Sequence, residues 1–256
     1  MAVKLVACLC TLLSAALTPL TVAASDLPST IQRIKPSIVG IGTVLLTRRP
    51  PVGLRATGFV VADGRYVITN AHSIVPKSRR KRAEYLAVLT NAHSSGARRA
   101  TVIKVDEVHD LALLQIEGSP LPSLKIANSE RVREGELYAF TGFPIGIVLG
   151  FFPVTHRGIV SAVTPIAIPQ ISSRSLSTAM VKRLRNPYKV FQLDATAYPG
   201  NSGSPLYDPG TGAVVGIINS VAVKESKENI LSKPSGITYA IPAIHALALM
   251  RAAGVK

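Results

Sequence analysis

The segment Tyr198-Pro199-Gly200-Asn201-Ser202-Gly203-Ser204-Pro205 places one serine between two glycines, one two positions before it and one directly after it. Glycine lets the backbone turn tightly and leaves room for another group to approach closely. In such a turn the amides of Gly200 and Ser202 can point at one spot, which is the geometry of an oxyanion hole. The pattern predicts Ser202 as a nucleophile, and a serine hydroxyl needs a neighbouring base for that role.

His72 is the best candidate for the base. It follows residues 66–71, a predicted strand that ends in small polar residues and would hold the imidazole in a defined position. His93 follows a similar Thr-Asn-Ala string, but the Ser-Ser-Gly after it indicates an exposed loop. The remaining histidines, which lack a comparable setting, are His109, His156 and His245.

Asp110 is the candidate that would orient the base. It begins the apolar run 110–116, where it could accept a hydrogen bond from the His72 ring and hold the correct tautomer. Asp106 is a competitor with a more charged neighbourhood. The order His72, Asp110, Ser202 is one of three unrelated chain orders found in triad hydrolases. A second order begins with serine and accompanies alternating strands and helices, and the sequence shows no such alternation.

Short runs rich in Val, Ile, Thr and Tyr recur between turn residues and predict an all-β sandwich or barrel. Helical periodicity is long only at 242–253, where Pro242 would occupy the first helical position, and a short helix is expected at 177–184. Residues 117–133 have weaker strand character and are expected to link two β units. The predicted strands are 37–46, 57–61, 66–69, 86–89, 101–105, 111–116, 137–140, 158–163, 190–193, 213–218 and 237–240.

Residues 1–24 have the pattern of a secretory signal peptide. A basic start is followed by an apolar stretch to Ala23, and Val22-Ala23-Ala24 places small residues before a cut after Ala24. Both cysteines, Cys8 and Cys10, lie inside this segment, so the exported chain would contain no disulfide. We therefore expect an exported protein, either periplasmic or secreted.

The composition is strongly basic, with 29 Lys and Arg against 14 Asp and Glu, a formal net charge of +15. This excess favours acidic polypeptides or an anionic surface as partners, although it also serves solubility. Seven Tyr, six Phe and no Trp leave no interleaving of aromatic and basic residues, so a nucleic-acid partner is not expected. The basic clusters, each readable as a docking site or as a solvated loop, are Lys77-Ser78-Arg79-Arg80-Lys81-Arg82, Arg98-Arg99 and Lys182-Arg183-Leu184-Arg185.

Seven segments together resemble the HtrA/Deg serine proteases, and the resemblance runs from about residue 38 to residue 242. It implies the trypsin-like fold: two six-stranded antiparallel β-barrels, the triad between them, a C-terminal helix, and no metal or cofactor. Residues 25–125 would then form the barrel with His72 and Asp110, and residues 126–256 the barrel with Ser202 and the helix. The segments are Ala56-Thr57-Gly58-Phe59-Val60-Val61, Thr69-Asn70-Ala71-His72, Asp110-Leu111-Ala112-Leu113-Leu114, Gly142-Phe143-Pro144, Arg157-Gly158-Ile159-Val160-Ser161, Gly200-Asn201-Ser202-Gly203 and Tyr239-Ala240-Ile241-Pro242.

Three features depart from the family pattern. The family usually carries a C-terminal PDZ domain, whereas only a short predicted helix follows Pro242 here. Ser204 replaces the usual glycine, and Gly-Asn-Ser-Gly-Ser-Pro is similar to the glutamyl endopeptidases instead. Residues 163–189 form a long basic loop region before the strand that leads to the nucleophile.

The resemblance also places the pocket for the substrate residue before the cleaved bond (P1), with walls at 194–199 and 217–219. Glutamyl endopeptidases are expected to have a histidine where Ile218 stands, and a basic-specific enzyme would need an aspartate near Thr196. The lining is therefore expected to be small and apolar, which predicts cleavage after Val, Ala or Ile. Asn219-Ser220-Val221 is the expected edge segment that pairs with the substrate backbone.

The leading hypothesis is an exported serine endopeptidase that acts on polypeptides through an acyl-enzyme, with His72, Asp110 and Ser202 as its triad. The alternative is a catalytically silent protein of the same fold that uses its basic loops to hold an anionic partner, since fold alone does not determine function. An esterase on this scaffold would need a pocket that no sequence motif reveals.

Overall fold

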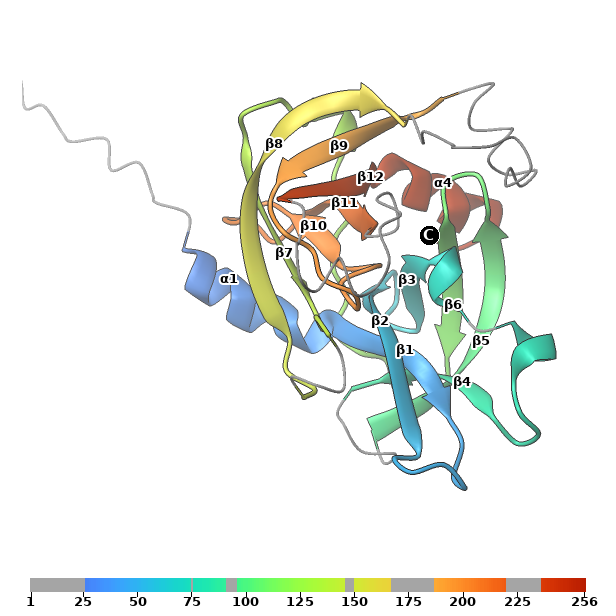
Figure 1. The fold of residues 1–256 in the computed structure, drawn as a ribbon. Coiled ribbons are helices and arrows are strands. Elements are labelled where there is room, and N and C mark those ends of the chain that lie inside the picture. Colours follow the sequence, from blue (N-terminus) through green and yellow to red (C-terminus); the bar gives the residue numbers. More distant parts are fainter. Residues whose placement is uncertain (1–25, 75, 91–95, 146–149, 167–186, 220–235) are drawn as a thin grey trace, which may run out of the picture.

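The computed structural model describes residues 26–74, 76–90, 96–145, 150–166, 187–219 and 236–256 (Figure 1). The signal segment, His93, Ser220 and the helix expected at 177–184 lie outside the described residues, as do the cations Lys182, Arg183 and Arg185. No helix in the described part is long and apolar enough to cross a bilayer.

The strands form two closed six-stranded antiparallel barrels, which confirms the predicted fold class. The first barrel has the order β1-β2-β3-β6-β5-β4 and the second the order β10-β11-β12-β9-β8-β7. The first comprises β1 (Ile38–Val44), β2 (Val52–Val61), β3 (Tyr66–Asn70), β4 (Tyr85–Leu89), β5 (Ala97–Asp106) and β6 (Leu111–Ile116). The second comprises β7 (Leu137–Gly142), β8 (Val154–Pro165), β9 (Lys189–Asp194), β10 (Pro205–Tyr207), β11 (Val214–Asn219) and β12 (Ile237–Pro242).

Two elements were not expected from the sequence. Strand β10 has only three residues and begins with proline, so it lacks a recognisable alternation, yet Leu206 pairs with Phe140 of β7 and closes the barrel. Helix α1 (Leu27–Ile34) is capped by the Asp26 carboxylate and packs against the second barrel, where Thr30 Oγ1 donates to the Gly210 carbonyl at 2.9 Å. These short elements are stabilised by tertiary contacts rather than by local pattern.

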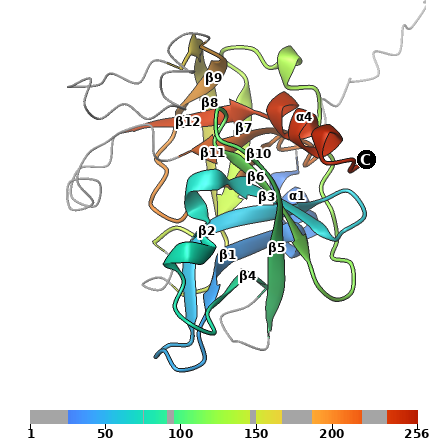
Figure 2. The same ribbon diagram turned by 90° about the vertical axis from the view of Figure 1, so that its right-hand side faces the viewer.

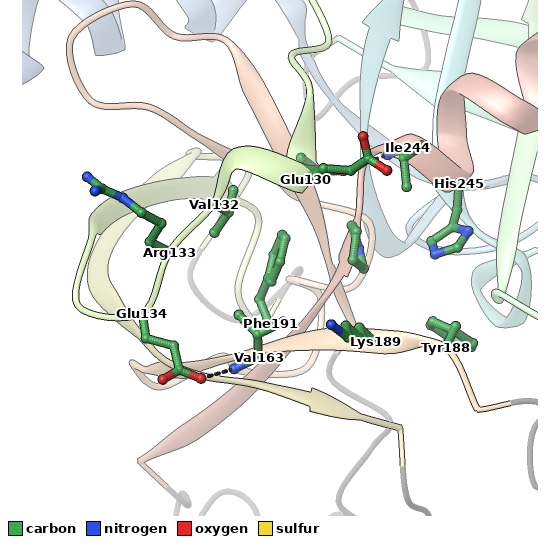
Figure 3. A pocket seen from close by; sticks show the side chains of 12 residues that line it. Glu130, Val132, Arg133, Glu134, Val163, Tyr188, Lys189, Phe191, Ile244 and His245 are labelled. Carbon is green, nitrogen blue, oxygen red and sulfur yellow. Dashed lines mark hydrogen bonds between the residues drawn. The ribbon is translucent and has the colours of Figure 1, made fainter.

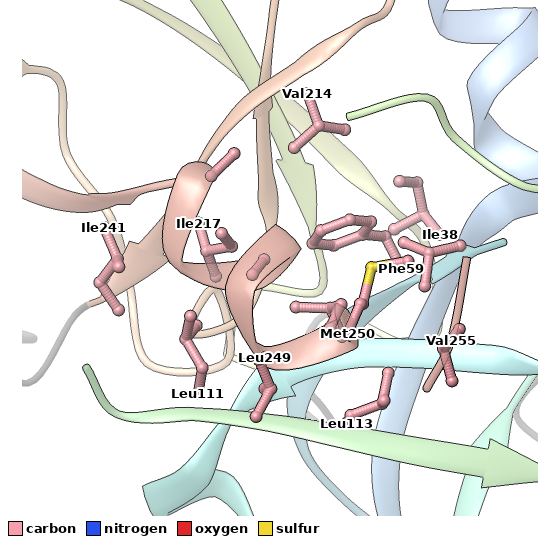
Figure 4. Packing of buried hydrophobic residues seen from close by; sticks show 14 of the residues in the cluster. Ile38, Phe59, Leu111, Leu113, Val214, Ile217, Ile241, Leu249, Met250 and Val255 are labelled. Atoms are coloured by element: carbon pink, nitrogen blue, oxygen red, sulfur yellow. The ribbon is translucent and has the colours of Figure 1, made fainter. Parts of the chain in front are cut away.

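The C-terminal helix α4 (Ile244–Ala252) is present but begins later than predicted. Pro242 is the last residue of β12 and pairs with Gly216, so its placement at the first helical position was wrong. Figure 2 shows α4 beside the junction of the two barrels. Leu249 and Met250 of this helix pack with Leu111 and Leu113 of β6 and with residues of β11 and β12 (Figure 4).

This shared core fixes the two barrels relative to each other. Burying a Leu or Met side chain contributes roughly 1.5–3 kcal/mol each, so the cluster supplies much of the energy that holds the cleft together. The segment that connects β6 and β7, residues 117–136, follows the same junction. Ile126 forms an isolated parallel bridge with Val214, and Ser129 Oγ accepts a hydrogen bond from the Ile244 amide at 3.0 Å.

Candidate active site

The glycine turn of the second barrel is held by Thr57 of the first. The Thr57 amide donates to the Ser202 carbonyl at 2.9 Å, and Thr57 Oγ1 donates to the Gly200 carbonyl at 2.8 Å. The same hydroxyl accepts from the Phe143 amide at 2.9 Å. Thr57 is fully buried, so one residue ties three points of the barrel junction together. Thr57 lies in the segment 56–61 that resembles the HtrA/Deg proteases, but no local sequence pattern predicts that it bonds the glycine turn.

Both glycines of the turn are required by its geometry. Gly200 has φ +102° and Gly203 has φ +86°, in the region that glycine adopts most readily. A Cβ atom on Gly203 would lie 2.1 Å from the Thr57 carbonyl oxygen, and one on Gly200 would lie 2.2 Å from that of Phe143. The turn can therefore approach the neighbouring backbones only with glycine at both positions.

His72 and Asp110 form a tightly bonded pair in the first barrel. His72 lies in a short 3-10 turn directly after β3, and Asp110 directly precedes β6, the partner of β3. The His72 Nδ1 atom lies 2.5 Å from Asp110 Oδ2, and the His72 amide donates to Oδ1 at 2.9 Å. The imidazole side chain is 30% exposed and the carboxylate 12%, so the ring can meet a substrate while the aspartate is shielded.

The backbone of Asp110 is also constrained. Its carbonyl accepts from the Ala71 amide at 3.0 Å and from Asn70 Nδ2 at 3.1 Å. Its φ of +55° is uncommon for a residue with a side chain, and such conformations persist where surrounding contacts enforce them. The two residues before His72 thus also hold the backbone of Asp110 in place.

Asn219 makes a contact that joins the two barrels at this pair. Its Nδ2 donates to Asp110 Oδ2 at 3.0 Å. The sequence indicated Asn219 as part of a pocket wall and of a substrate-pairing edge, and its contact to a residue 109 positions away had no sequence signal. Asp110 therefore receives hydrogen bonds from His72 and from the second barrel at once.

The other predicted site residues lie around the turn. Thr196 is half-buried in the coil that precedes it, and Ile218 is fully buried in the core of the second barrel. The Ile218 carbonyl accepts from the Gly203 amide, and its own amide donates to the Ser204 carbonyl, both at 2.9 Å. Within the described residues no acceptor is found for the Gly200 amide.

Ser204, the departure from the family pattern, faces the interior. It is fully buried, and a Cβ on Gly142 would lie 2.0 Å from its hydroxyl oxygen. Among the described atoms its Oγ has no hydrogen-bond partner. Because the hydroxyl lies in the barrel junction, Ser204 does not form part of a substrate-facing surface.

Asp106, the competitor of Asp110, belongs to a different cluster. Its carboxylate accepts from the His109 amide at 3.1 Å and lies 2.6 Å from His109 Nδ1. Burial raises the pKa of Asp106, but the hydrogen bonds from His109 outweigh this and leave the pKa below its usual value. The His109 ring stacks on His245 of α4 with centroids 3.8 Å apart, and Tyr188 packs edge-on against both.

His245 and Tyr188 also line a cavity of about 590 Å³ between α4, β9 and the linker (Figure 3). Burial, with the neighbouring His109, lowers the pKa of His245 to about 4. The native state then binds fewer protons than the unfolded chain between pH 6.5 and pH 4, so stability falls as the pH drops through this window.

His245→Phe keeps a flat ring on His109 but removes the titration. Between pH 7.5 and pH 4.5 the free energy of unfolding should fall less in the variant than in the parent. We expect the two losses to differ by about 1–2 kcal/mol, after allowing for the partial exposure of the ring. Urea unfolding at the two pH values measures the difference. An identical loss in both proteins would contradict the assignment.

The described residues contain no group of three or more His, Cys, Asp or Glu side chains placed to hold a metal ion. Two closed barrels with a histidine–aspartate pair on one and a serine in a two-glycine turn on the other define the trypsin-like class. The sequence profile of the trypsin-like peptidase domain matches residues 56–217, more than half of the chain, and the chain belongs to that family.

Within the family the relatives are HtrA-like. A DegP-like periplasmic serine endoprotease of Pseudomonas fluorescens is 30% identical over 186 residues, 73% of this chain and 32% of the relative. Its counterpart in Hahella chejuensis is 29% identical over 79% of this chain and 36% of its own. The chain thus spans about a third of the length of these curated relatives.

Solved structures of the same type share the fold. The HtrA-type protease AlgW with a tripeptide has a TM-score of 0.61 and 23% identity, covering 88% of this chain and 62% of AlgW. A serine endoprotease from Yersinia pestis has the same TM-score and 22% identity, covering 90% of this chain and 67% of its own.

Proposed function

We propose that the protein is an exported serine endopeptidase in which Ser202 attacks the peptide carbonyl, His72 takes and returns the proton, and Asp110 orients the ring. The observation that carries the proposal is the bonding of Asp110, which receives both the His72 ring and the His72 amide. Thr57 supports it further, because its strand lies beside β3, which leads into the turn with His72, while the Thr57 backbone holds Ser202.

Each residue then has a defined step. With Nδ1 bonded to the carboxylate, His72 presents Nε2 as the base that removes the Ser202 proton. The alkoxide adds to the carbonyl, and the amides of Gly200 and Ser202 stabilise the negative charge on its oxygen. His72 then protonates the leaving amine, an acyl-enzyme remains on Ser202, and water releases it by the same steps.

A fluorophosphonate probe tests the nucleophile directly. We expect one covalent adduct per folded molecule, located at Ser202 by peptide mass mapping, together with cleavage of casein. Heat-denatured protein serves as the control, because an isolated serine hydroxyl is unreactive. Intact, folded protein that neither reacts nor cleaves casein would favour the silent anion-binding alternative.

The P1 preference in the proposal is for small aliphatic residues. Thr196 lies between Ala195 and Ala197, which pack against the core of the second barrel, and Asp194 is the one charged residue in the predicted wall 194–199. We expect a peptide library with varied P1 to be cleaved fastest after Val, Ala or Ile. Preferred cleavage after Arg or Glu would contradict this part of the proposal while leaving the triad intact.

The proposal includes polypeptide substrates and a periplasmic site of action. The relatives are named periplasmic serine endoproteases, and residues 1–24 have the pattern of an export signal. The basic clusters extend the proposal to an acidic polypeptide or an anionic surface as partner.

A further inference from the structure

A hollow of about 610 Å³ lies between the segment that leaves β3 and the face of β4 and β5. Ala71, directly before His72, belongs to its lining, and so does Glu107, three residues before Asp110. The hollow is therefore bounded by the two chain segments that carry the histidine–aspartate pair. A group bound there would contact Ala71, the residue directly before His72.

Two arginines, Arg80 and Arg99, line this hollow. The Arg99 guanidinium lies over the Tyr85 ring, 4.2 Å from its centroid, which restricts its orientation, and the residue is exposed. A guanidinium held in this way can bind a carboxylate through two parallel hydrogen bonds. It also loses less side-chain entropy on binding than a freely rotating lysine would.

The floor of the hollow is apolar. Leu86 is 1% exposed and Ala100 7%, and the half-buried Ile74 and Val102 pack beside them. Apolar walls reduce the local dielectric constant, which strengthens the attraction between a guanidinium and a carboxylate. Arg99 thus lies in surroundings in which charge recognition is effective.

The rim of the hollow carries further cations. Arg79, Lys81 and Arg82 are exposed, and none of the carboxylates in the described residues lies within 4 Å of their charged groups. Glu84, the acid next to them in sequence, is engaged by Arg48 at 3.0 Å. Glu107 is the one acidic residue among the described residues of the lining.

We propose that this hollow is an acidic-residue subsite, which binds a Glu or Asp side chain of the polypeptide substrate within a few residues of the cleaved bond. The inference rests on the proposed endopeptidase function. A recessed hollow lined by Ala71, the residue before His72, suits a single carboxylate on an extended peptide, whereas a flat anionic membrane would first meet the exposed rim.

The experiment uses two peptides with the same aliphatic cleavage sequence, one with Glu and one with Gln at the flanking positions. We expect the unaltered protein to cleave the acidic peptide at least about tenfold more efficiently (kcat/KM) at low salt, and the preference to shrink as salt rises. Arg99→Gln and Tyr85→Leu should reduce the ratio towards one. Arg65→Gln, the same charge change elsewhere on the first barrel, should leave it unchanged.

The outcomes separate the subsite from the catalytic proposal. Equal cleavage of both peptides, or a preference that survives Arg99→Gln in folded protein, overturns the subsite and leaves the peptidase standing. If neither peptide is cleaved, binding is measured instead, by fluorescence anisotropy of the labelled peptides. We expect the acidic peptide to bind more tightly than the Gln peptide, and Arg99→Gln to abolish this difference. If the protein shows no preference between the peptides but binds vesicles of anionic phospholipid, and Arg99→Gln abolishes that binding, the site would be assigned to a membrane instead.

Discussion

Ser202→Ala is expected to lower kcat for a cleaved peptide by about 10⁴- to 10⁶-fold. The change deletes the attacking oxygen and leaves the turn intact, because Ser202 is held through its backbone carbonyl by the Thr57 amide at 2.9 Å. The side chain is already shielded, with the residue 6% exposed, so no large rearrangement should follow. Single-turnover cleavage of a fluorogenic peptide, with a melting curve for each protein, provides the measurement.

Ser204→Ala is the matched control. It removes the hydroxyl group of a serine two residues further along the chain. This hydroxyl is buried and has no hydrogen-bond partner among the described atoms. We expect kcat to stay within about threefold of the parent, and stability to be unchanged or slightly higher, since a buried unsatisfied hydroxyl is costly. Similar losses of kcat in both variants would show that the turn, and not the Ser202 hydroxyl, had been disturbed.

Asp110→Asn is expected to lower kcat by about 10⁴-fold, through the wrong histidine tautomer. The carboxylate oxygens accept from the His72 amide, the His72 ring and Asn219 Nδ2. An asparagine has one oxygen and one NH₂ group, so at least one of these donors would face another donor. The variant should therefore also lose about 1–3 kcal/mol of stability.

Asp106→Asn separates the loss of the Asp110–His72 interaction from the general effect of replacing an aspartate that bonds a histidine. It makes the same chemical change at a carboxylate that bonds His109 instead of His72. Its kcat should stay far above that of Asp110→Asn, and any loss should accompany lower stability. A loss in Asp106→Asn as large as in Asp110→Asn would contradict the assignment of the triad aspartate.

Several parts of the fold could be predicted because their signals are local. Strands such as 111–116 show β-rich runs bounded by turn residues, and β6 has the same bounds. β10 and α1 could not, because three and eight residues give too little pattern and both are stabilised by contacts with distant strands. Pro242 was misassigned because proline suits both a first helical turn and the end of a strand.

The sequence by itself determined Ser202 as the candidate nucleophile, because a serine between two glycines is a local pattern. The structure gives these two glycines, Gly200 and Gly203, φ angles of +102° and +86°. Tertiary structure alone decided what holds the site together. Thr57 bonds Gly200 across 143 residues and Asn219 bonds Asp110 across 109, and the lining of the basic hollow meets only where β4 and β5 pair. Such contacts form when the two barrels close on a common core, and side-chain partners that distant leave no trace in local periodicity.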